Sequence, residues 1–179
     1  MQDLPPLASL GRRIMILGPT NSGKSTLAVA VAQKLDIPAI HLDRLQHLPN
    51  TNWQVRPEEE FAALHDQVIL EPSWVIDGGY SRLAPQRVRR ATAILVIDAG
   101  LATRYRRYFY RTLLQKSRAG ALEGEQDSLN WLMLRWLWKS RNAAGKYRQL
   151  ALASGLPHVF TGTPEELNRL YASWDLKRK

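Results

Sequence analysis

The chain has 179 residues, 45% of them hydrophobic and 23% charged, which suits one globular domain with a substantial core. It contains no cysteine, so disulfides, thiolate metal sites and cysteine nucleophiles are excluded. The formal net charge of +9 indicates an anionic partner, which nucleotide phosphates, nucleic acid or an acidic surface would each satisfy. Residues 1–10 lack signal-peptide features, and the most apolar later run, 131–138, is too short to span a bilayer. We therefore expect a cytoplasmic protein without a membrane partner.

The predicted elements alternate between strands and helices along the chain. Short apolar runs predict strands near residues 14–17, 37–42, 74–76, 94–97 and 158–160. Apolar periodicity, or a proline followed by acidic residues, predicts helices from residue 23 onward and over about 57–70, 101–116, 127–141 and 164–173. This alternation predicts an α/β fold with a parallel sheet, and we expect a single domain over 1–179.

A glycine-bounded loop follows the first predicted strand. Its sequence matches the pattern G-x-x-x-x-G-K-[ST] at every fixed position and opens the first predicted helix. The glycines permit close phosphate approach, the loop amides present partial positive charge, the lysine reaches the β- and γ-phosphates, and the serine hydroxyl ligates magnesium. The sequence therefore predicts nucleotide binding by Gly18, Pro19, Thr20, Asn21, Ser22, Gly23, Lys24, Ser25 and Thr26.

A phosphate loop of this kind requires a carboxylate at a neighbouring strand end to hold the metal with Ser25. Asp77 and Asp98 each end an apolar strand, and strand periodicity does not choose between them. We favour Asp77, because Gly78 and Gly79 after it leave room for a ligand.

Two further residues are candidates for contacting a phosphoryl acceptor. Asp43 follows the second predicted strand, where ligands of doubly wound sheets collect, and it could orient or deprotonate an acceptor hydroxyl. The alternative is an ion pair between Asp43 and Arg44 on a solvated loop. Arg82, just beyond Tyr80, is the second candidate for the acceptor.

The segment 104–111 is rich in arginine and tyrosine. On a helix, Arg104, Arg107 and Arg111 share one face, and arginines there could stabilise the charge of a transferring phosphoryl group. The alternatives are a solvated basic face or a nucleic-acid patch with stacking aromatic rings. Arg141 could close over the nucleotide from a lid, and the aromatic run 131–138 is expected to pack between helices or in a homodimer contact.

Several of these motifs together resemble the adenylate-kinase-related proteins known as DNA topology modulation proteins. The resemblance rests on the phosphate loop, His41-Leu42-Asp43, Trp53, the run from Trp74 to Tyr80, Asp98, Arg107 and Arg111. It implies a three-layer fold with five parallel strands in the order 2-3-1-4-5, an acceptor-binding segment at 43–70, a helical lid at 112–145, and ATP with Mg²⁺ as ligands. Gly79 departs from the pattern, because relatives usually carry asparagine there, and the adenylate-kinase string D-G-F-P-R is absent.

These observations predict a magnesium-dependent kinase that transfers the γ-phosphoryl group of ATP to a small nucleotide or hydroxyl-bearing metabolite. In this prediction Lys24, Arg107, Arg111 and Asp43 are catalytic, Ser25 and Asp77 hold the metal, and Asp43 and Arg82 contact the acceptor. A nucleic-acid-associated ATPase and a non-catalytic nucleotide-binding protein are the alternatives, and the sequence leaves the acceptor and the choice between ATP and GTP open.

Overall fold

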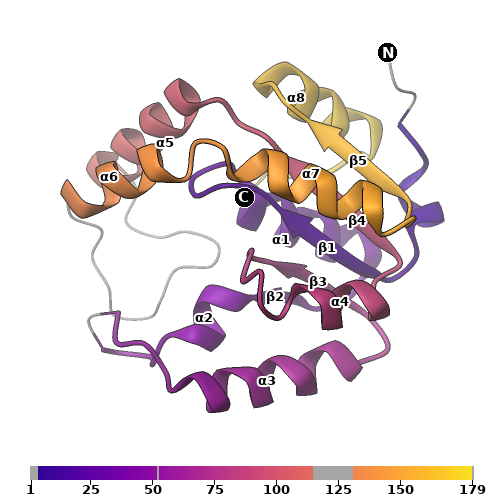
Figure 1. The fold of residues 1–179 in the computed structure, drawn as a ribbon. Coiled ribbons are helices and arrows are strands. Elements are labelled where there is room, and N and C mark those ends of the chain that lie inside the picture. The colour runs from indigo at the N-terminus through magenta and orange to yellow at the C-terminus, as the bar shows by residue number, and fades with distance from the viewer. Residues whose placement is uncertain (1–3, 52, 115–130, 179) are drawn as a thin grey trace.

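Five short strands lie side by side in one parallel sheet at the centre of the molecule (Figure 1). The computed structural model describes residues 4–51, 53–114 and 131–178. The strands follow the spatial order β2-β3-β1-β4-β5, which confirms the predicted fold class and strand order. Their bounds are Arg13–Leu17 (β1), Ala39–His41 (β2), Trp74–Asp77 (β3), Ala93–Ile97 (β4) and His158–Thr161 (β5).

Helices cover both faces of this sheet, so the central strands β1, β3 and β4 are buried on two sides. Ile14 and Ile16 of β1 face a core shared with α1 and α8, while Met15 and Leu17 face one shared with α3, α4 and α7. The near-continuous apolar runs of the sequence follow from this double burial. The helices span Leu7–Leu10 (η1, a 3-10 helix), Lys24–Leu35 (α1), Leu42–Gln46 (α2), Glu58–Leu70 (α3), Ala84–Arg90 (α4), Leu101–Leu114 (α5), Trp131–Lys139 (α6), Ala143–Ala153 (α7) and Pro164–Ser173 (α8).

The register of the strands gathers polar residues at one edge of the sheet. Asp77, the last residue of β3, pairs with Ile16 of β1 on one side and with His41 of β2 on the other. The carboxyl ends of parallel strands share one edge, so the loops after β1, β2 and β3 converge there. Ligands of doubly wound sheets bind at this edge.

Several helices, η1 and α2 among them, and one strand end differ from the sequence-based expectations. α4 and α7 were not predicted, because α4 carries three arginines in seven residues and α7 contains Gly145 near its start. The second strand ends at His41, because Leu42 turns into the core with no exposed surface and begins α2. Asp43 therefore lies in the first turn of α2 and does not close the strand.

The predicted lid at 112–145 falls only partly within the described residues. Residues 115–130 lie outside them, and the helix expected over 127–141 is described as α6 from Trp131 to Lys139. Leu137 is fully buried, whereas Trp131 and Trp138 are exposed. Of these three residues, only Leu137 agrees with the prediction that the run 131–138 packs between helices. None of the helices in the described part of the chain is both long and apolar enough to cross a lipid bilayer.

We expect the free energy of unfolding to decrease as the pH is lowered, partly because of His65. This side chain has no exposed surface, and its pKa is lowered, chiefly by burial. Below its ordinary value of 6.5 the unfolded chain takes up a proton that the folded chain does not, so stability falls as the pH falls toward the lowered folded-state pKa. The limiting slope is about 1.4 kcal/mol per pH unit. Urea titrations between pH 7.5 and 5.0 should show a smaller loss for His65→Gln, and equal losses in both proteins would contradict the assignment.

Candidate functional site

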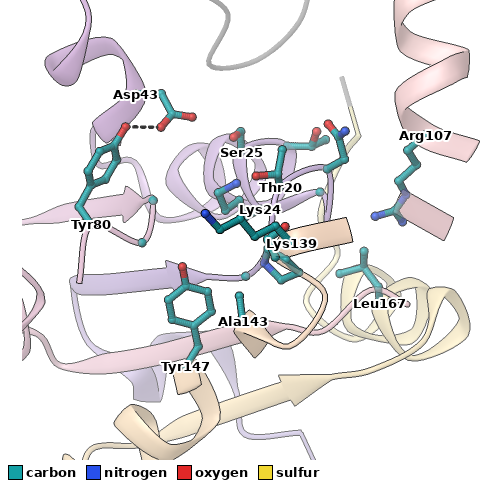
Figure 2. Close-up of a pocket in the computed structure, with 18 of the residues that line it drawn as sticks. Thr20, Lys24, Ser25, Asp43, Tyr80, Arg107, Lys139, Ala143, Tyr147 and Leu167 are labelled. Carbon is teal, nitrogen blue, oxygen red and sulfur yellow. Dashed lines mark hydrogen bonds between the residues drawn. The ribbon is translucent and has the colours of Figure 1, made fainter. Parts of the chain in front are cut away.

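A large pocket opens at the carboxyl edge of the sheet. Its volume is about 1420 Å³, and it joins the loop after β1 to α2, to the turn after β3 and to the junction between α6 and α7. Figure 2 shows Asp43 and Tyr80 on one side of this pocket and Arg107 and Leu167 on the other, with Thr20, Lys24 and Ser25 between them. Every predicted loop residue from 18 to 26 lines the pocket except Ser22, whose side chain is fully buried.

The phosphate loop is shaped by a left-handed residue at the start of α1. Gly23 has a φ of 97° and caps the helix, and a Cβ atom there would lie 3.0 Å from Nη1 of Arg107. Glycine at this position therefore both permits the turn and lets an arginine approach the backbone. The amides at the start of α1 follow directly, and a helix N-terminus of this kind favours anions.

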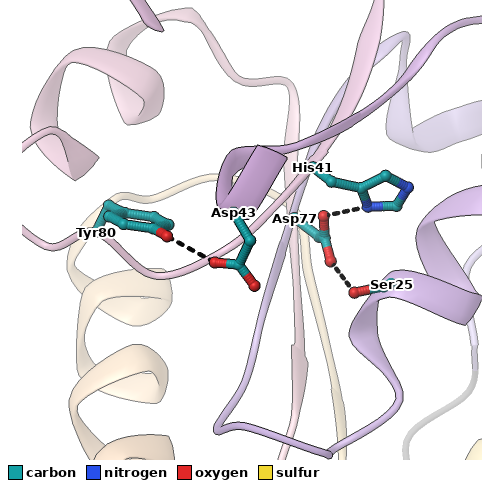
Figure 3. Close-up of polar contacts among 5 residues, drawn as sticks. All are labelled: Ser25, His41, Asp43, Asp77 and Tyr80. Carbon is teal, nitrogen blue, oxygen red and sulfur yellow. Dashed lines mark hydrogen bonds and ion pairs between the residues drawn. The ribbon is translucent and has the colours of Figure 1, made fainter. Parts of the chain in front are cut away.

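Ser25, Asp77 and His41 form a hydrogen-bonded row beside the loop (Figure 3). The Ser25 hydroxyl donates to Oδ2 of Asp77, and Nδ1 of His41 lies 2.6 Å from Oδ1 of the same carboxylate. The carboxylate can only accept, so Nδ1 of His41 carries the proton. Asp98, the alternative candidate, lies outside the pocket with Oδ2 3.8 Å from Nε of Arg148.

Asp43 reaches the same pocket from α2 and accepts a hydrogen bond from Tyr80. The phenol oxygen of Tyr80 lies 2.6 Å from Oδ1 of Asp43 (Figure 3). Burial, followed by the charge of Asp43, raises the pKa of Tyr80, so its hydroxyl keeps its proton and acts as a donor. The structure thus places a hydroxyl group against the carboxylate of Asp43.

A buried arginine of α4 is hydrogen-bonded to the turn after β3. Arg87 of α4 has no exposed surface, and its Nη2 donates to the carbonyl oxygen of Gly79. Burial lowers its pKa to about 10, with the phenols of Tyr147 and Tyr80 acting in the opposite direction. The guanidinium therefore stays charged at neutral pH and holds the Gly78-Gly79 backbone that lines the pocket.

The opposite end of the pocket is cationic. Arg107 of α5 donates through Nη1 to the carbonyl oxygen of Ser22, and its pKa is lowered by burial and then by the charges of Arg178 and Arg106. Together with Lys24, the cations that line the pocket are Arg106, Arg107, Lys139 and Arg178. The backbone of Arg111 lies in α5, but its side chain lies outside the described part of the structure, so its predicted role stays a prediction.

Arg104 ties the phosphate loop to the junction between α6 and α7. Its side chain is 1% exposed, and burial lowers its pKa. Nε donates to the carbonyl oxygen of Thr20 at 2.8 Å, while Nη2 donates to the Ser140 hydroxyl at 2.6 Å and Nη1 to the Ser140 carbonyl at 3.4 Å. One buried side chain thereby holds Ser140, and with it Lys139, against the loop.

Replacing Arg104 with methionine should lower the free energy of unfolding by about 3 kcal/mol, because three partly buried oxygen atoms would lose a charged donor. Arg106→Met on the same helix is the matched control, since Arg106 is exposed and its loss should change stability by about 0.5 kcal/mol or less. Urea denaturation measures both values. Equal losses in the two variants would contradict the bridging role of Arg104.

Two predicted site residues lie away from the pocket. Arg82 turns outward and pairs with Glu58 of α3, with 2.5 Å between Nη1 and Oε1, and it lines a separate small recess. Arg141 stacks over the ring of Trp138 at 4.8 Å and donates to the Trp138 carbonyl at 3.2 Å. Neither side chain reaches the pocket, because each is held by a partner next to it.

Sequence reasoning missed several residues that the fold brings to the site. From the sequence, His41 is named only as part of the family resemblance and is assigned no role, although the pairing of adjacent strand ends could have placed it beside Asp77. Tyr147 and Lys139 carry no sequence signal, because they reach the pocket from helices distant in sequence from the loop.

Comparisons with known proteins agree with this fold. A family model for isopentenyl transferase matches residues 12–55. Shikimate kinase from Bacteroides thetaiotaomicron is 19% identical, with a TM-score of 0.51 over 92% of this chain and 99% of that one. Shikimate kinase from Acinetobacter baumannii in complex with shikimate is 17% identical, with a TM-score of 0.52 over 93% and 96% of the two chains. A sugar kinase from Janibacter is 16% identical, with the same TM-score over 92% and 95%.

These similarities concern the fold of the protein. No curated protein matches the chain. The similar structures cover nearly its whole length, and the chain shares the doubly wound fold of P-loop kinases, with the phosphate loop at the expected place between β1 and α1. The match to the family model includes that loop.

Proposed function

We propose that this protein is an ATP-dependent kinase that transfers the γ-phosphoryl group to a hydroxyl of a small acceptor. One observation carries the proposal: a single pocket joins the phosphate loop to a carboxylate, Asp43, that already holds a hydroxyl donor at 2.6 Å. The similar structures include kinases named for shikimate and for a sugar, and by analogy we propose a small-molecule acceptor here. The resemblance to adenylate-kinase-related DNA topology modulation proteins stays part of this proposal.

Phosphoryl transfer depends mainly on positioning and on stabilising charge. Lys24 lies at the first turn of α1 and Arg107 lies against Gly23, so both side chains are placed to neutralise the phosphate oxygens. We assign Arg111 of α5 to the same task. The reacting acceptor oxygen would attack the γ-phosphorus, the bond from that phosphorus to the bridging oxygen would break, ADP would leave, and the hydroxyl proton would pass to the carboxylate of Asp43.

The Ser25 hydroxyl and the Asp77 carboxylate fit a magnesium site. Both supply oxygen atoms, they lie in direct contact, and Ser25 lines the pocket beside Lys24. Magnesium prefers such oxygen donors, commonly one or two from protein together with substrate phosphates, and when bound it neutralises charge on the phosphates. His41 would keep Asp77 oriented through its hydrogen bond.

A coupled ADP-release screen over alcohols, sugars, nucleosides and nucleoside monophosphates tests this function. We expect at least one acceptor to raise ADP release well above the rate with water alone, in a magnesium-dependent manner. Binding of Mg·ATP without stimulation by any acceptor would contradict a kinase and favour a nucleotide-binding protein. Stimulation by DNA with steep salt dependence would favour a nucleic-acid-associated ATPase.

A further inference from the structure

We infer that Lys139 is a further phosphate-binding residue, which contacts the γ-phosphoryl group of the nucleotide, and that Arg104 is the positioning residue that holds it there. This inference deepens the proposed function and rests on it, because it assumes that the phosphate loop receives ATP. It concerns the wall of the pocket formed by α5, α6 and α7, which the loop pattern does not include.

Lys139 reaches the middle of the pocket from α6. It is the last residue of that helix, and it lines the same pocket as Lys24. Figure 2 shows the two lysines between Asp43 and Tyr80 on one side and Arg107 on the other. The group to be transferred must lie between the phosphate loop and the carboxylate that receives the acceptor. A cation in this middle position is therefore placed for the terminal phosphate of the nucleotide.

The two lysines bring like charges into one concave site. Neither Lys24 nor Lys139 forms a hydrogen bond or ion pair with another residue in the described part of the chain. Arg107 differs from them, because it donates to the carbonyl oxygen of Ser22. Ammonium groups that share a pocket repel each other, and an anion bound between them removes that repulsion. A phosphate group of the nucleotide supplies such an anion.

Arg104 sets the position of Lys139 relative to the phosphate loop. Its buried guanidinium donates to the carbonyl oxygen of Thr20 in the loop at 2.8 Å and to the hydroxyl of Ser140 at 2.6 Å. The Ser140 hydroxyl donates in turn to the carbonyl oxygen of Leu137 at 3.3 Å, so the end of α6 is joined to the loop through one side chain. The backbone of Lys139 is therefore held near the loop before a nucleotide binds, which lowers the entropic cost of the contact.

Calorimetry with two nucleotides separates the terminal phosphate from the other two. Mg·ADP and Mg·AMP-PNP share the α- and β-phosphates, and only AMP-PNP carries a third phosphate group. In Lys139→Met we expect the Kd of Mg·AMP-PNP to rise about tenfold and the Kd of Mg·ADP to change less than about twofold. Lys139→Arg should restore most of the lost affinity, because it keeps the charge. Lys146→Met is the matched control, since Lys146 is an exposed residue of α7 outside the pocket.

The inference and the proposed function fail in different ways. A change in Lys139→Met that is not specific to Mg·AMP-PNP, or no change with either nucleotide, would overturn the role of Lys139 and leave the phosphate loop as the nucleotide site. If the wild-type protein binds neither nucleotide, the proposed function is overturned as well.

Combining two variants tests the positioning role of Arg104. Arg104→Met should raise the Kd of Mg·AMP-PNP more than the Kd of Mg·ADP. The double variant with Lys139→Met should lose no more of this preference than Lys139→Met alone, because Arg104 acts through Lys139. Thermal melts verify that each variant is folded at the assay temperature. If Arg104→Met is not, Ser140→Ala takes its place in the comparison, since it removes only the hydroxyl contact. Losses that multiply in the double variant would overturn the positioning role.

Discussion

Replacing Lys24 with alanine is expected to lower kcat/KM for ATP about 10³-fold in the ADP-release assay. Lys24 is the first residue of α1 and lines the pocket beside Ser25, so its ammonium group is placed where charge gathers on the β- and γ-phosphates. Losing one such preorganised donor costs about 10²–10³ in rate in other enzymes, and weaker nucleotide binding adds to that cost. A 10³-fold loss corresponds to about 4 kcal/mol of transition-state stabilisation.

Helix α1 offers a matched control at its other end. Lys34→Ala removes the same side chain from an exposed position, where Lys34 pairs with Asp175 at 2.8 Å. Exposed ion pairs of this kind contribute little to stability, so we expect wild-type kinetics and a melting temperature close to the wild-type value. If Lys24→Ala keeps its activity within about threefold of wild type, the phosphate loop is not the site of transfer.

The central sheet and the phosphate loop were predictable because their signals are local. The run Ile14-Met15-Ile16-Leu17 is apolar since both faces of β1 are covered, and the loop pattern depends on residues adjacent in the chain. The preference for Asp77 over Asp98 was also stated from sequence alone, and the structure places Asp77 against Ser25. The strand order itself came from the family resemblance, and spacing alone did not supply it.

The remainder of the candidate site depends on contacts between distant segments. Arg104 and Ser140 are far apart in sequence, and nothing in either segment indicates that a buried guanidinium joins them. The same holds for Tyr147 and Gly79, where the sequence showed an unusual glycine but not the phenol that lies over it. Packing decides such contacts, and packing cannot be derived from periodicity.

Arg82 and Arg141 illustrate a second limit of sequence reasoning. Both were predicted to reach ligands because arginine suits phosphate, and that preference is a property of the residue type. Their direction is set by neighbours: Glu58 of α3 attracts Arg82, and the ring of Trp138 holds Arg141. Arg107, by contrast, is directed inward because Gly23 leaves space for it. The direction of these arginine side chains was thus predicted less well by residue type than by the space that a nearby glycine leaves.

Replacing Asp43 with asparagine should lower kcat about 10³-fold while changing the Kd for Mg·ATP less than about twofold. The amide keeps the size of the carboxylate but cannot take the proton of the acceptor hydroxyl, and general-base catalysis contributes about 10²–10⁴ in rate. Asp43 lies on α2, across the pocket from Arg107, so the nucleotide contacts should persist (Figure 2). Single-turnover ADP release gives the rate, and titration calorimetry gives the nucleotide affinity.

The variant Tyr80→Phe distinguishes two roles for Asp43: a general base in the reaction, or a carboxylate that only positions Tyr80. This variant removes the hydroxyl that now donates to Asp43 at 2.6 Å, but it leaves the carboxylate and the ring that packs on Phe61 at 5.0 Å. If Asp43 serves the acceptor hydroxyl, kcat in Tyr80→Phe should fall by about tenfold or less, since the acceptor supplies its own donor. If Asp43 only anchors Tyr80, Tyr80→Phe should lose at least as much activity as Asp43→Asn, because asparagine can still accept the hydrogen bond of the Tyr80 hydroxyl whereas phenylalanine removes that donor. A loss in Tyr80→Phe as large as that in Asp43→Asn would therefore rule out Asp43 as the proton acceptor.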